Sequence, residues 1–328
     1  MVKIVLTGAC GFIGHHVAEY IHKNTDWNII IFDKLTYASM GLNRLRKNEL
    51  FDSPRVKIYT IDICNDISEG IKKEIGNDID FIVHMAAETH VDNSIREPKN
   101  VIINNVHSTI NLLEWARTLT QLKIFFNFST DEVYGTALND ILYKEWDRHR
   151  PTNPYSASKS AAENICIAYE NTYNIPLMTV NVMNAYGERQ YVEKFIPLCI
   201  KKILNDELIY IHSYPDAIKS GSRFYIHAQN IASAVLFLIQ NGKIGEKYNI
   251  TGEKEVSNLE LAKLISTYIG KELKYEMIDH VHNRPGHDLR YGLDGSKIRE
   301  LGWSPEFDFE KSLEKTVKWT LENREWLE

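Results

Sequence analysis

Residues 2–14, VKIVLTGACGFIG, decide the fold. The apolar segment at residues 2–7 is followed at once by Gly8, Gly11 and Gly14, which open an amphipathic stretch reaching to about residue 23. A strand, a glycine-rich turn and a helix in this order are typical of a dinucleotide-binding unit, because glycines allow a tight turn and let backbone N–H groups approach a pyrophosphate. Glycines alone are a weak signal, but the flanking strand and helix make it strong.

The alternation of apolar and amphipathic segments continues beyond this unit. Further short apolar segments, each predicted to be a strand, lie at residues 28–32, 56–61, 81–85, 124–128 and 177–182. This order predicts an α/β fold: a Rossmann-type doubly wound parallel sheet with a smaller C-terminal α/β substrate domain. We place the dinucleotide-binding domain at residues 1–183, with about 224–245 returning to it, and the substrate domain mainly at 184–328. No Pro-, Ser- or Gly-rich linker separates them, so we expect the site in the cleft between them.

The composition excludes several classes of function. The chain has 328 residues, a net charge of -6 and no long Lys/Arg run, which argues against a nucleic-acid partner. No apolar run reaches the roughly 18 residues needed to cross a bilayer, and the N-terminal segment lacks the features of a secretory signal. The four cysteines are scattered, without clustered histidines, so we expect neither disulfides nor a metal site. These observations predict a soluble, cytoplasmic protein that binds no membrane.

The cofactor-binding residues follow the ends of the predicted strands. Asp33 ends the second strand, roughly 20 residues after the glycines, where a carboxylate binds the adenosine ribose and repels a 2′-phosphate, so NAD is favoured over NADP. Asp62 and Ile63 follow the third strand and are expected to touch the adenine, although Asp62 is equally well explained as a helix N-cap. Ala86 and Ala87 begin a small-residue loop that passes beneath the cofactor. The set is completed by the turn residues Gly8, Gly11, Phe12, Ile13 and Gly14.

Two further motifs carry the chemistry. STDEVYG, residues 129–135, follows a buried strand, and two adjacent carboxylates there, Asp131 and Glu132, are costly to bury unless they do chemistry or meet cations. In YSASK, Tyr155 and Lys159 lie one helical turn apart, so the Lys charge can lower the phenol pKa and make it a base. The opposing interpretation is that the carboxylates cap a turn or form a surface ion pair and that the tyrosine only packs.

These motifs together resemble those of one family. TGACGFIG, Asp33 in FDKLTYA, the AAETHVDNSI loop, STDEVYG, YSASK and RPGHDLRY fall in the order and spacing of the extended short-chain dehydrogenase/reductases. Among these the chain most resembles the nucleotide-sugar 4,6-dehydratases that act on dTDP-glucose. The Asp-Glu pair is the discriminating part, because related 4-epimerases usually lack it. The resemblance also implies tightly bound NAD and a homodimer formed through helices at residues 98–118 and 155–173.

The resemblance implies a role for each residue. Tyr155 would take the proton of the C4 hydroxyl while a hydride leaves C4, and Thr130 would hydrogen-bond near the same hydroxyl. Glu132 would then remove the C5 proton, and protonated Asp131 would donate to the departing C6 hydroxyl. Lys159 would hold the nicotinamide ribose. Return of the hydride to C6 would give a 4-keto-6-deoxyhexose and regenerate the cofactor, as in deoxysugar biosynthesis.

The substrate side is assigned by the same resemblance. Family members contact the diphosphate and sugar at the positions of Asn184, Lys194 and Phe195, and place an arginine beside the phosphates at the position of Arg223. The nucleotide is expected at Arg284 and His287. Thr89 and His90 complete the predicted substrate-binding set. Each charged residue here is also compatible with an ordinary surface salt bridge.

Departures from the family pattern cluster on this side. The segment NAYGERQ carries Ala185 in place of an asparagine and Glu188 and Arg189 in place of a proline and an aromatic residue, while Lys254 and Asn283 replace an asparagine and an aspartate. These changes keep open a UDP-sugar substrate such as UDP-N-acetylglucosamine, with 4,6- or 5,6-dehydration. A nucleotide-sugar 4-epimerase is the nearest rival activity. A protein of another class, an NAD-bound sensor without turnover, is disfavoured by the intact Tyr and Lys.

Overall fold

The computed structural model describes residues 1–328 except 139, 216–217, 280–285 and 287. Within the described part of the chain, seven parallel strands form the central sheet in the order β11-β6-β5-β4-β1-β2-β3. Their bounds are β1 Lys3–Thr7, β2 Asn28–Asp33, β3 Val56–Thr60, β4 Phe81–His84, β5 Ile124–Thr130, β6 Leu177–Val182 and β11 Lys247–Ile250. The predicted doubly wound parallel sheet is confirmed.

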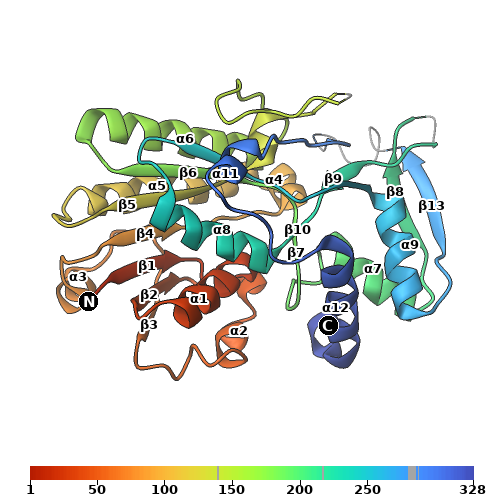
Figure 1. Cartoon of the computed structure of the whole chain (residues 1–328), viewed down its shortest axis with the longest axis horizontal. Coiled ribbons are helices and arrows are strands. Elements are labelled where there is room, and N and C mark those ends of the chain that lie inside the picture. The colour runs from red at the N-terminus through yellow and green to blue at the C-terminus, as the bar shows by residue number, and fades with distance from the viewer. Residues whose placement is uncertain (139, 216–217, 280–285, 287) are drawn as a thin grey trace.

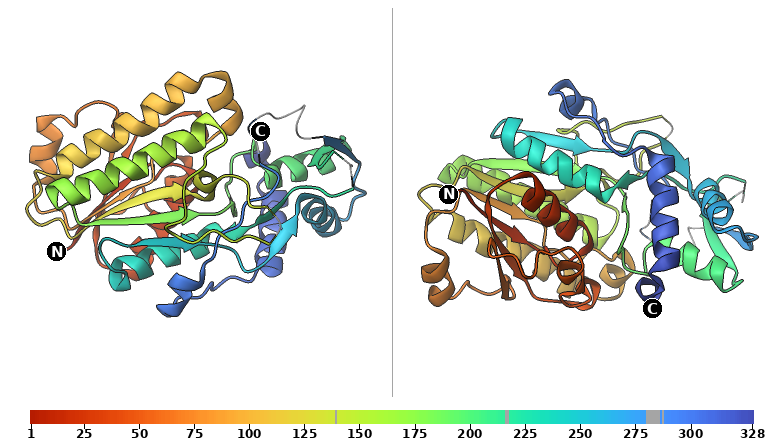
Figure 2. Two further views of the ribbon diagram at one scale, coloured as in Figure 1. Left: turned by 90° about the horizontal axis from the view of Figure 1, so that it is seen from above. Right: turned by 60° about the horizontal axis from the view of Figure 1, so that its bottom comes forward.

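Helices cover both faces of this sheet, as Figures 1 and 2 show. On one face α1 (Phe12–Asn24) packs beside α8 (Ala228–Asn241), and on the other α5 (Pro98–Ala116) packs beside α6 (Pro154–Tyr173). Side chains alternate between the two faces: Ile4 and Leu6 of β1 join the core under α1 and α8, whereas Val5 joins the core under α5 and α6. Because both faces are covered, β5 is buried along its whole length.

Shorter elements connect the strands of this first layer. They are η1 (Tyr37–Ser39), α2 (Asn43–Arg46), α3 (Glu69–Ile75), α4 (Val91–Arg96) and η2 (Asp131–Tyr134). The loop expected at AAETHVDNSI therefore extends only to residue 90, and that part of the prediction was wrong. His90 caps α4, because its Nδ1 accepts a hydrogen bond from Asn93 N at 3.2 Å.

The C-terminal elements form a second core beside the sheet, at the right of Figure 1. The helices α7, α9 and α12 surround a cluster that includes Ile200, Ile265 and Val317. Among the described residues, three two-stranded pairings, β10-β7, β12-β9 and β13-β8, border it. Bounds are β7 Ala185–Tyr186, α7 Phe195–Leu204, β8 Ile209–Ser213, β9 Ser222–Phe224, β10 Ile226–His227, β12 Glu255–Ser257, α9 Asn258–Ile269, β13 Tyr275–Asp279, α11 Ser296–Glu300, α12 Phe309–Glu322 and η3 Arg324–Leu327.

Two segments from the second half of the chain lie in the first layer. The helix α8 packs on α1, and β11 pairs in parallel with β6, placing Tyr248 beside Val180. The division of the chain into domains at residue 183 stays a prediction. No helix within the described ranges is long and apolar enough to span a membrane.

Candidate active site

A cavity of about 380 Å³ opens at the carboxyl ends of the central strands. It is lined from the sheet on one side and from the segment before α7 on the other. The structure brings most of the predicted site residues into this one cavity: Gly8, Gly11, Phe12, Ile13, Gly14, Asp33, Asp62, Ile63, Ala86, Ala87, Thr89, Thr130, Asp131, Glu132, Tyr155, Lys159, Asn184, Lys194 and Phe195. Their individual roles stay predictions.

Close packing explains two of the three glycines after β1. Gly8 has a φ of +72°, and a Cβ atom there would lie 2.8 Å from Ala86 Cα. A Cβ atom at Gly14 would lie 2.7 Å from Ala9 Cα, so only glycine lets α1 start this close to the turn. The turn therefore leaves its backbone open toward the cavity, as a pyrophosphate requires.

Asp33 ends β2 at the cavity wall. Its Oδ2 accepts a hydrogen bond from Cys10 N at 2.9 Å, and its Oδ1 accepts one from Leu35 N at 2.8 Å. Burial raises the pKa of this carboxyl, and the two backbone N–H groups oppose that rise. The carboxylate thus ties the glycine turn to the end of the second strand while it faces the cavity.

Asp131 is buried at the end of β5. Thr130 Oγ1 donates a hydrogen bond to its Oδ1 at 2.9 Å, whereas its Oδ2 is buried without a hydrogen-bond partner among the described residues. Burial, and then the charge of Glu132, raise the pKa of Asp131 to about 7. A carboxyl that keeps its proton near neutral pH can serve as a general acid.

Glu132 is less buried than its neighbour and is held by two donors. Its Oε2 accepts hydrogen bonds from Asn153 Nδ2 at 3.1 Å and from Tyr291 OH at 3.2 Å. Neither partner was predicted from the sequence. Asn153 was detectable as the residue before Pro154 at a helix start, and Tyr291 ends the motif RPGHDLRY, from which only Arg284 and His287 were chosen.

Tyr155 and Lys159 are presented by the first turns of α6. Asn153 caps this helix through a reciprocal hydrogen-bond pair with Ser156. Burial, and then the charge of Glu132, raise the pKa of the Tyr155 phenol, while a hydrogen bond with Thr130 opposes the rise. The sequence predicts a lowered phenol pKa from the Lys159 charge, but burial dominates. Burial also lowers the pKa of Lys159 to about 8, against the attraction of Glu163.

Two predicted substrate residues within the described part of the chain, His90 and Arg223, are not among those lining the cavity. His90 caps α4, and its Nε2 lies 3.8 Å from Glu193 Oε2. Arg223 donates to the backbone oxygens of Ser222, Asp288 and Leu289 and lies over the Tyr291 ring. The charge of Arg223 nevertheless lowers the pKa of Asp131. Arg284 and His287 lie outside the described residues.

The segment before α7 contributes lining residues that were not predicted. Tyr191 and Glu193 line the cavity beside Lys194. Tyr37 of η1 donates to Glu193 Oε2 at 3.3 Å, and its ring lies 5.6 Å from that of Tyr191. This contact joins the strand-β2 side of the cavity to the substrate side. Only the aromatic and acidic composition of the sequence segment YVEKF pointed to it.

The family model described as GDP-mannose 4,6 dehydratase matches residues 5–316. The chain belongs to this family. It is 38% identical over 351 residues to a dTDP-glucose 4,6-dehydratase of Escherichia coli, covering 100% of this chain and 95% of the relative. A dTDP-glucose 4,6-dehydratase of Neisseria meningitidis is also 38% identical, over 99% of this chain and 95% of its own. The predicted resemblance to nucleotide-sugar dehydratases is confirmed.

Solved structures of similar proteins have the same fold. A dTDP-glucose 4,6-dehydratase of Streptomyces venezuelae, solved with NAD and dTDP bound, superposes with a TM-score of 0.88 at 31% identity, covering 100% of this chain and 99% of the other. A UDP-glucuronic acid 4-epimerase of Bacillus cereus reaches the same TM-score at 25% identity, covering 98% and 100%. Shape alone therefore does not separate the dehydratases from the epimerases, whereas sequence identity favours the dehydratases.

Proposed function

We propose that this chain is an NAD-dependent dTDP-glucose 4,6-dehydratase, which converts dTDP-glucose to dTDP-4-keto-6-deoxyglucose and water. The observation that carries the proposal is the pair Asp131 and Glu132, two adjacent carboxyls in different environments beside Tyr155. Burial raises the pKa of Asp131 to about 7, so it can hold a proton. Glu132 is oriented by Asn153 and Tyr291. One group is thereby suited to give a proton and the other to take one.

The residues around the cavity suit NAD. The open glycine turn accepts a pyrophosphate, and Asp33 at the end of β2 accepts ribose hydroxyls and repels a 2′-phosphate. Similar dehydratases from Streptomyces venezuelae and Bacillus anthracis were solved with NAD. When bound, NAD⁺ would supply the redox chemistry, taking up a hydride from C4 and giving it back at C6, and the residues that would hold it are those of the glycine turn together with Asp33, Tyr155 and Lys159.

Three protein groups then move protons, and a fourth keeps two of them in place. Tyr155 takes the proton of the C4 hydroxyl as C4 becomes a ketone, which makes the C5 hydrogen acidic. Glu132 removes that C5 proton, and Asp131 gives its proton to the C6 hydroxyl, which leaves as water. Glu132 returns a proton to C5 when C6 receives the hydride, so the product carries one solvent-derived hydrogen at C5. Thr130, which bonds both Tyr155 and Asp131, keeps the two groups side by side.

A panel of sugar nucleotides in deuterated water tests this proposal. Purified protein, without added NAD, would be incubated with dTDP-, UDP-, GDP- and CDP-sugars and the products analysed by mass. We expect dTDP-glucose to lose water and gain one deuterium at C5, with the Glu132→Gln variant as background. Release of an epimer without loss of water would overturn the dehydratase assignment in favour of a 4-epimerase.

A UDP-sugar is the second candidate substrate. The chain is 36% identical over 327 residues to the UDP-glucose 4,6-dehydratase-containing trifunctional enzyme of Arabidopsis thaliana, covering 48% of that protein. Most of the departures from the family pattern, however, lie away from the cavity. Glu188 pairs with His227, and Lys254 pairs with Glu310. Of the departures within the described residues, only Ala185 lines the cavity. Because the other described departures do not line it, dTDP-glucose remains the first choice of substrate.

We also propose a homodimer formed through α5 and α6. Ile102 and Ile103 of α5 are 39% and 43% exposed, and Ile95 of the adjacent α4 is 38% exposed. Exposed isoleucines grouped beside a long helix pair favour a protein partner, and a second copy offers the matching apolar face.

We further propose that the enzyme works in the cytoplasm, since Cys10, Cys64, Cys166 and Cys199 are unpaired thiols.

A further inference from the structure

Arg44 of α2 is a fully buried arginine that makes no salt bridge within the part of the chain that the structure describes. Its guanidinium instead donates to four backbone oxygens. Nε donates to Arg189 O at 3.0 Å, and Nη1 donates to Cys10 O at 3.2 Å, Ala38 O at 2.8 Å and Ser39 O at 2.7 Å. Burying a cation is costly, so the backbone around it must hold these oxygens in place.

The four oxygens belong to three segments, each of which contributes residues to the wall of the cavity. Cys10 lies in the glycine turn between Gly8 and Gly11, and its N–H also binds Asp33. Ala38 and Ser39 line the cavity after β2. Arg189 belongs to the substrate-side segment that precedes α7. One rigid guanidinium therefore fixes the spacing of the glycine turn, the segment after Asp33 and the substrate side.

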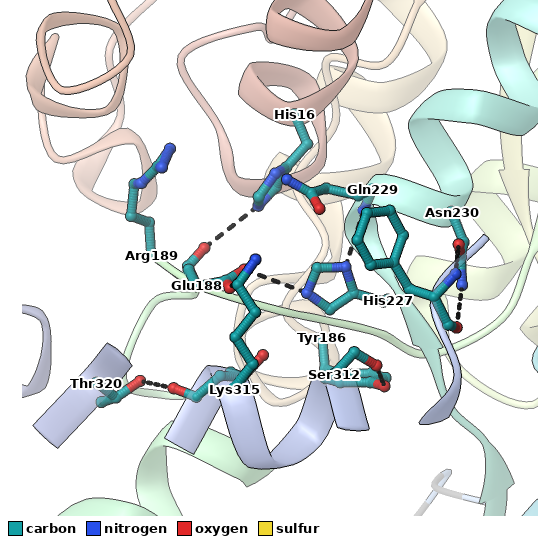
Figure 3. Close-up of polar contacts among 12 residues, drawn as sticks. His16, Tyr186, Glu188, Arg189, His227, Gln229, Asn230, Ser312, Lys315 and Thr320 are labelled. Atoms are coloured by element: carbon teal, nitrogen blue, oxygen red, sulfur yellow. Dashed lines mark hydrogen bonds and ion pairs between the residues drawn. The ribbon is translucent and has the colours of Figure 1, made fainter. Parts of the chain in front are cut away.

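The substrate-side wall is itself anchored next to Arg189, through the contacts of Glu188 that Figure 3 shows. Glu188 Oε2 lies 3.1 Å from His227 Nε2, and the Glu188 backbone oxygen lies 3.3 Å from His16 Nε2. Lys315 of α12 lies 3.6 Å from the other carboxylate oxygen of Glu188. The residue after this anchor, Arg189, has a φ of +66° and turns its carbonyl to Arg44.

The next residue, Gln190, returns the chain to the cavity. It lines the cavity, and its Nε2 donates to the oxygen of Ala185, another lining residue, at 2.8 Å. A shift of the Arg44 guanidinium would therefore move the glycine turn, the adenosine end and the substrate side relative to one another. Arg44 itself is not among the residues that line the cavity, so any effect on a ligand passes through these backbone contacts.

We propose that Arg44 is a positioning residue that sets how tightly the enzyme holds its dinucleotide. The inference rests on the proposed function only in that NAD is the ligand of this cavity; it does not depend on which sugar is dehydrated. When the Arg44 guanidinium is removed, the glycine turn, the segment after Asp33 and the substrate-side segment keep their secondary structure. The distances between these three segments are then no longer fixed. The expected effect is faster loss of NAD rather than loss of the chemical step.

The chain offers a matched control in Arg55. This arginine also binds backbone oxygens, with Nη1 donating to Thr25 O at 2.7 Å and Trp27 O at 3.4 Å and Nη2 donating to His22 O at 2.7 Å. These oxygens lie at the C-terminal end of α1 and just before the start of β2. These are the ends of the two elements away from the cavity, and none of the three residues lines it. Substituting Arg55 removes a comparable set of bonds from the same domain without touching the cofactor walls.

The test measures the rate at which NAD leaves the purified holoenzyme, using excess yeast alcohol dehydrogenase and ethanol to capture released NAD. Arg44→Met, Arg44→Lys and Arg55→Met would be compared with wild type, together with their melting temperatures. We expect Arg44→Met to release NAD at least tenfold faster, Arg44→Lys to lie between it and wild type, and Arg55→Met to stay within twofold. Both Met variants are expected to melt at lower temperature.

Equal release rates in Arg44→Met and Arg55→Met would overturn the inference, because the effect would then follow stability alone. If Arg44→Met does not fold, Arg44→Lys decides: release at the wild-type rate would overturn the inference. Wild-type protein that neither carries nor binds NAD would overturn the proposed function itself. The failure of the positioning role is therefore distinguishable from the failure of the cofactor assignment.

Discussion

Tyr291 donates its phenolic hydrogen to Glu132 Oε2 at 3.2 Å, across 159 positions of sequence. We predict that Tyr291→Phe lowers kcat about tenfold or more and leaves KM nearly unchanged, because a hydrogen bond to a charged group contributes about 1.5–3 kcal/mol. Tyr143→Phe is the matched control, since Tyr143 donates to the backbone oxygen of Thr136 instead. Steady-state kinetics of both variants check this. An equal loss of activity in the two would contradict an orienting role for Tyr291.

Glu132→Gln should keep the hydrogen bonds of the side chain while removing its basicity. We expect this variant to purify with NAD bound but to exchange no C5 hydrogen with solvent. Mass spectrometry of the sugar nucleotide after incubation in deuterated water measures the exchange. Wild-type levels of deuterium in the variant would show that another group removes the C5 proton.

Asp131 makes both activity and stability depend on pH. Its pKa is about 7 in the folded protein and near 4 in the unfolded chain. The folded state therefore binds the proton more tightly, and its stability falls as pH rises from about 4 through 7. We expect kcat to fall above about pH 7 as the acid loses its proton.

Asp131→Asn should remove the loss of stability that the ionisation of Asp131 causes at high pH. The variant should melt at a higher temperature than wild type at pH 8, and the difference should shrink toward pH 4. Its dehydration rate should be very low at every pH, because an amide gives no proton. Thermal melts from pH 4 to 8 measure the trend, and a difference that grew toward acid would contradict the raised pKa.

Gly14→Ala tests the close approach of α1 to the glycine turn. The added Cβ would lie 2.7 Å from Ala9 Cα, which is backbone and cannot move aside easily. We predict a loss of stability of about 1–3 kcal/mol and loss of bound NAD. Gly70→Ala in α3 is the control, where the added atom comes no nearer than 4.0 Å to its neighbours and alanine favours the helix.

If the proposed dimer forms through α5, negative charges placed on the exposed face of this helix should dissociate it. Ile102→Asp with Ile103→Asp should convert a dimer to a monomer, because two buried carboxylates would face an apolar partner surface. Leu208→Asp is the control, since Leu208 is 40% exposed and lies just before β8, in the C-terminal part of the chain. Light scattering after gel filtration gives the mass directly. A wild-type monomer would refute the proposal.

The cofactor half of the site could be predicted because its signals are local. Glycines between a strand and a helix, and Asp33 at a strand end, follow from backbone sterics within a few residues. Tyr155 and Lys159 are similarly linked by one helical turn. The paired carboxylates were predicted because burying them needs a chemical reason.

The remaining features depend on contacts between distant segments. Tyr291 reaches Glu132 only because the last third of the chain folds back over the sheet, and no local pattern records that. Arg223 was placed beside the phosphates, yet its donors bind the carbonyls of residues 288 and 289. The predicted lowering of the Tyr155 pKa by Lys159 is not seen, because burial and the Glu132 charge raise that pKa, and burial is a property of the whole fold.

A ribosome delivers this chain from the N-terminus, at about 5–20 residues per second. The outer strand β11 ends at Ile250 and lies beside β6, which ends at Val182. Throughout the synthesis of the intervening residues, β6 presents unpaired backbone N–H and C=O groups, the kind of edge that recruits strands from other chains. The nascent protein therefore passes through an interval of exposure to aggregation, and a fragment ending near residue 183 should precipitate when it is expressed alone.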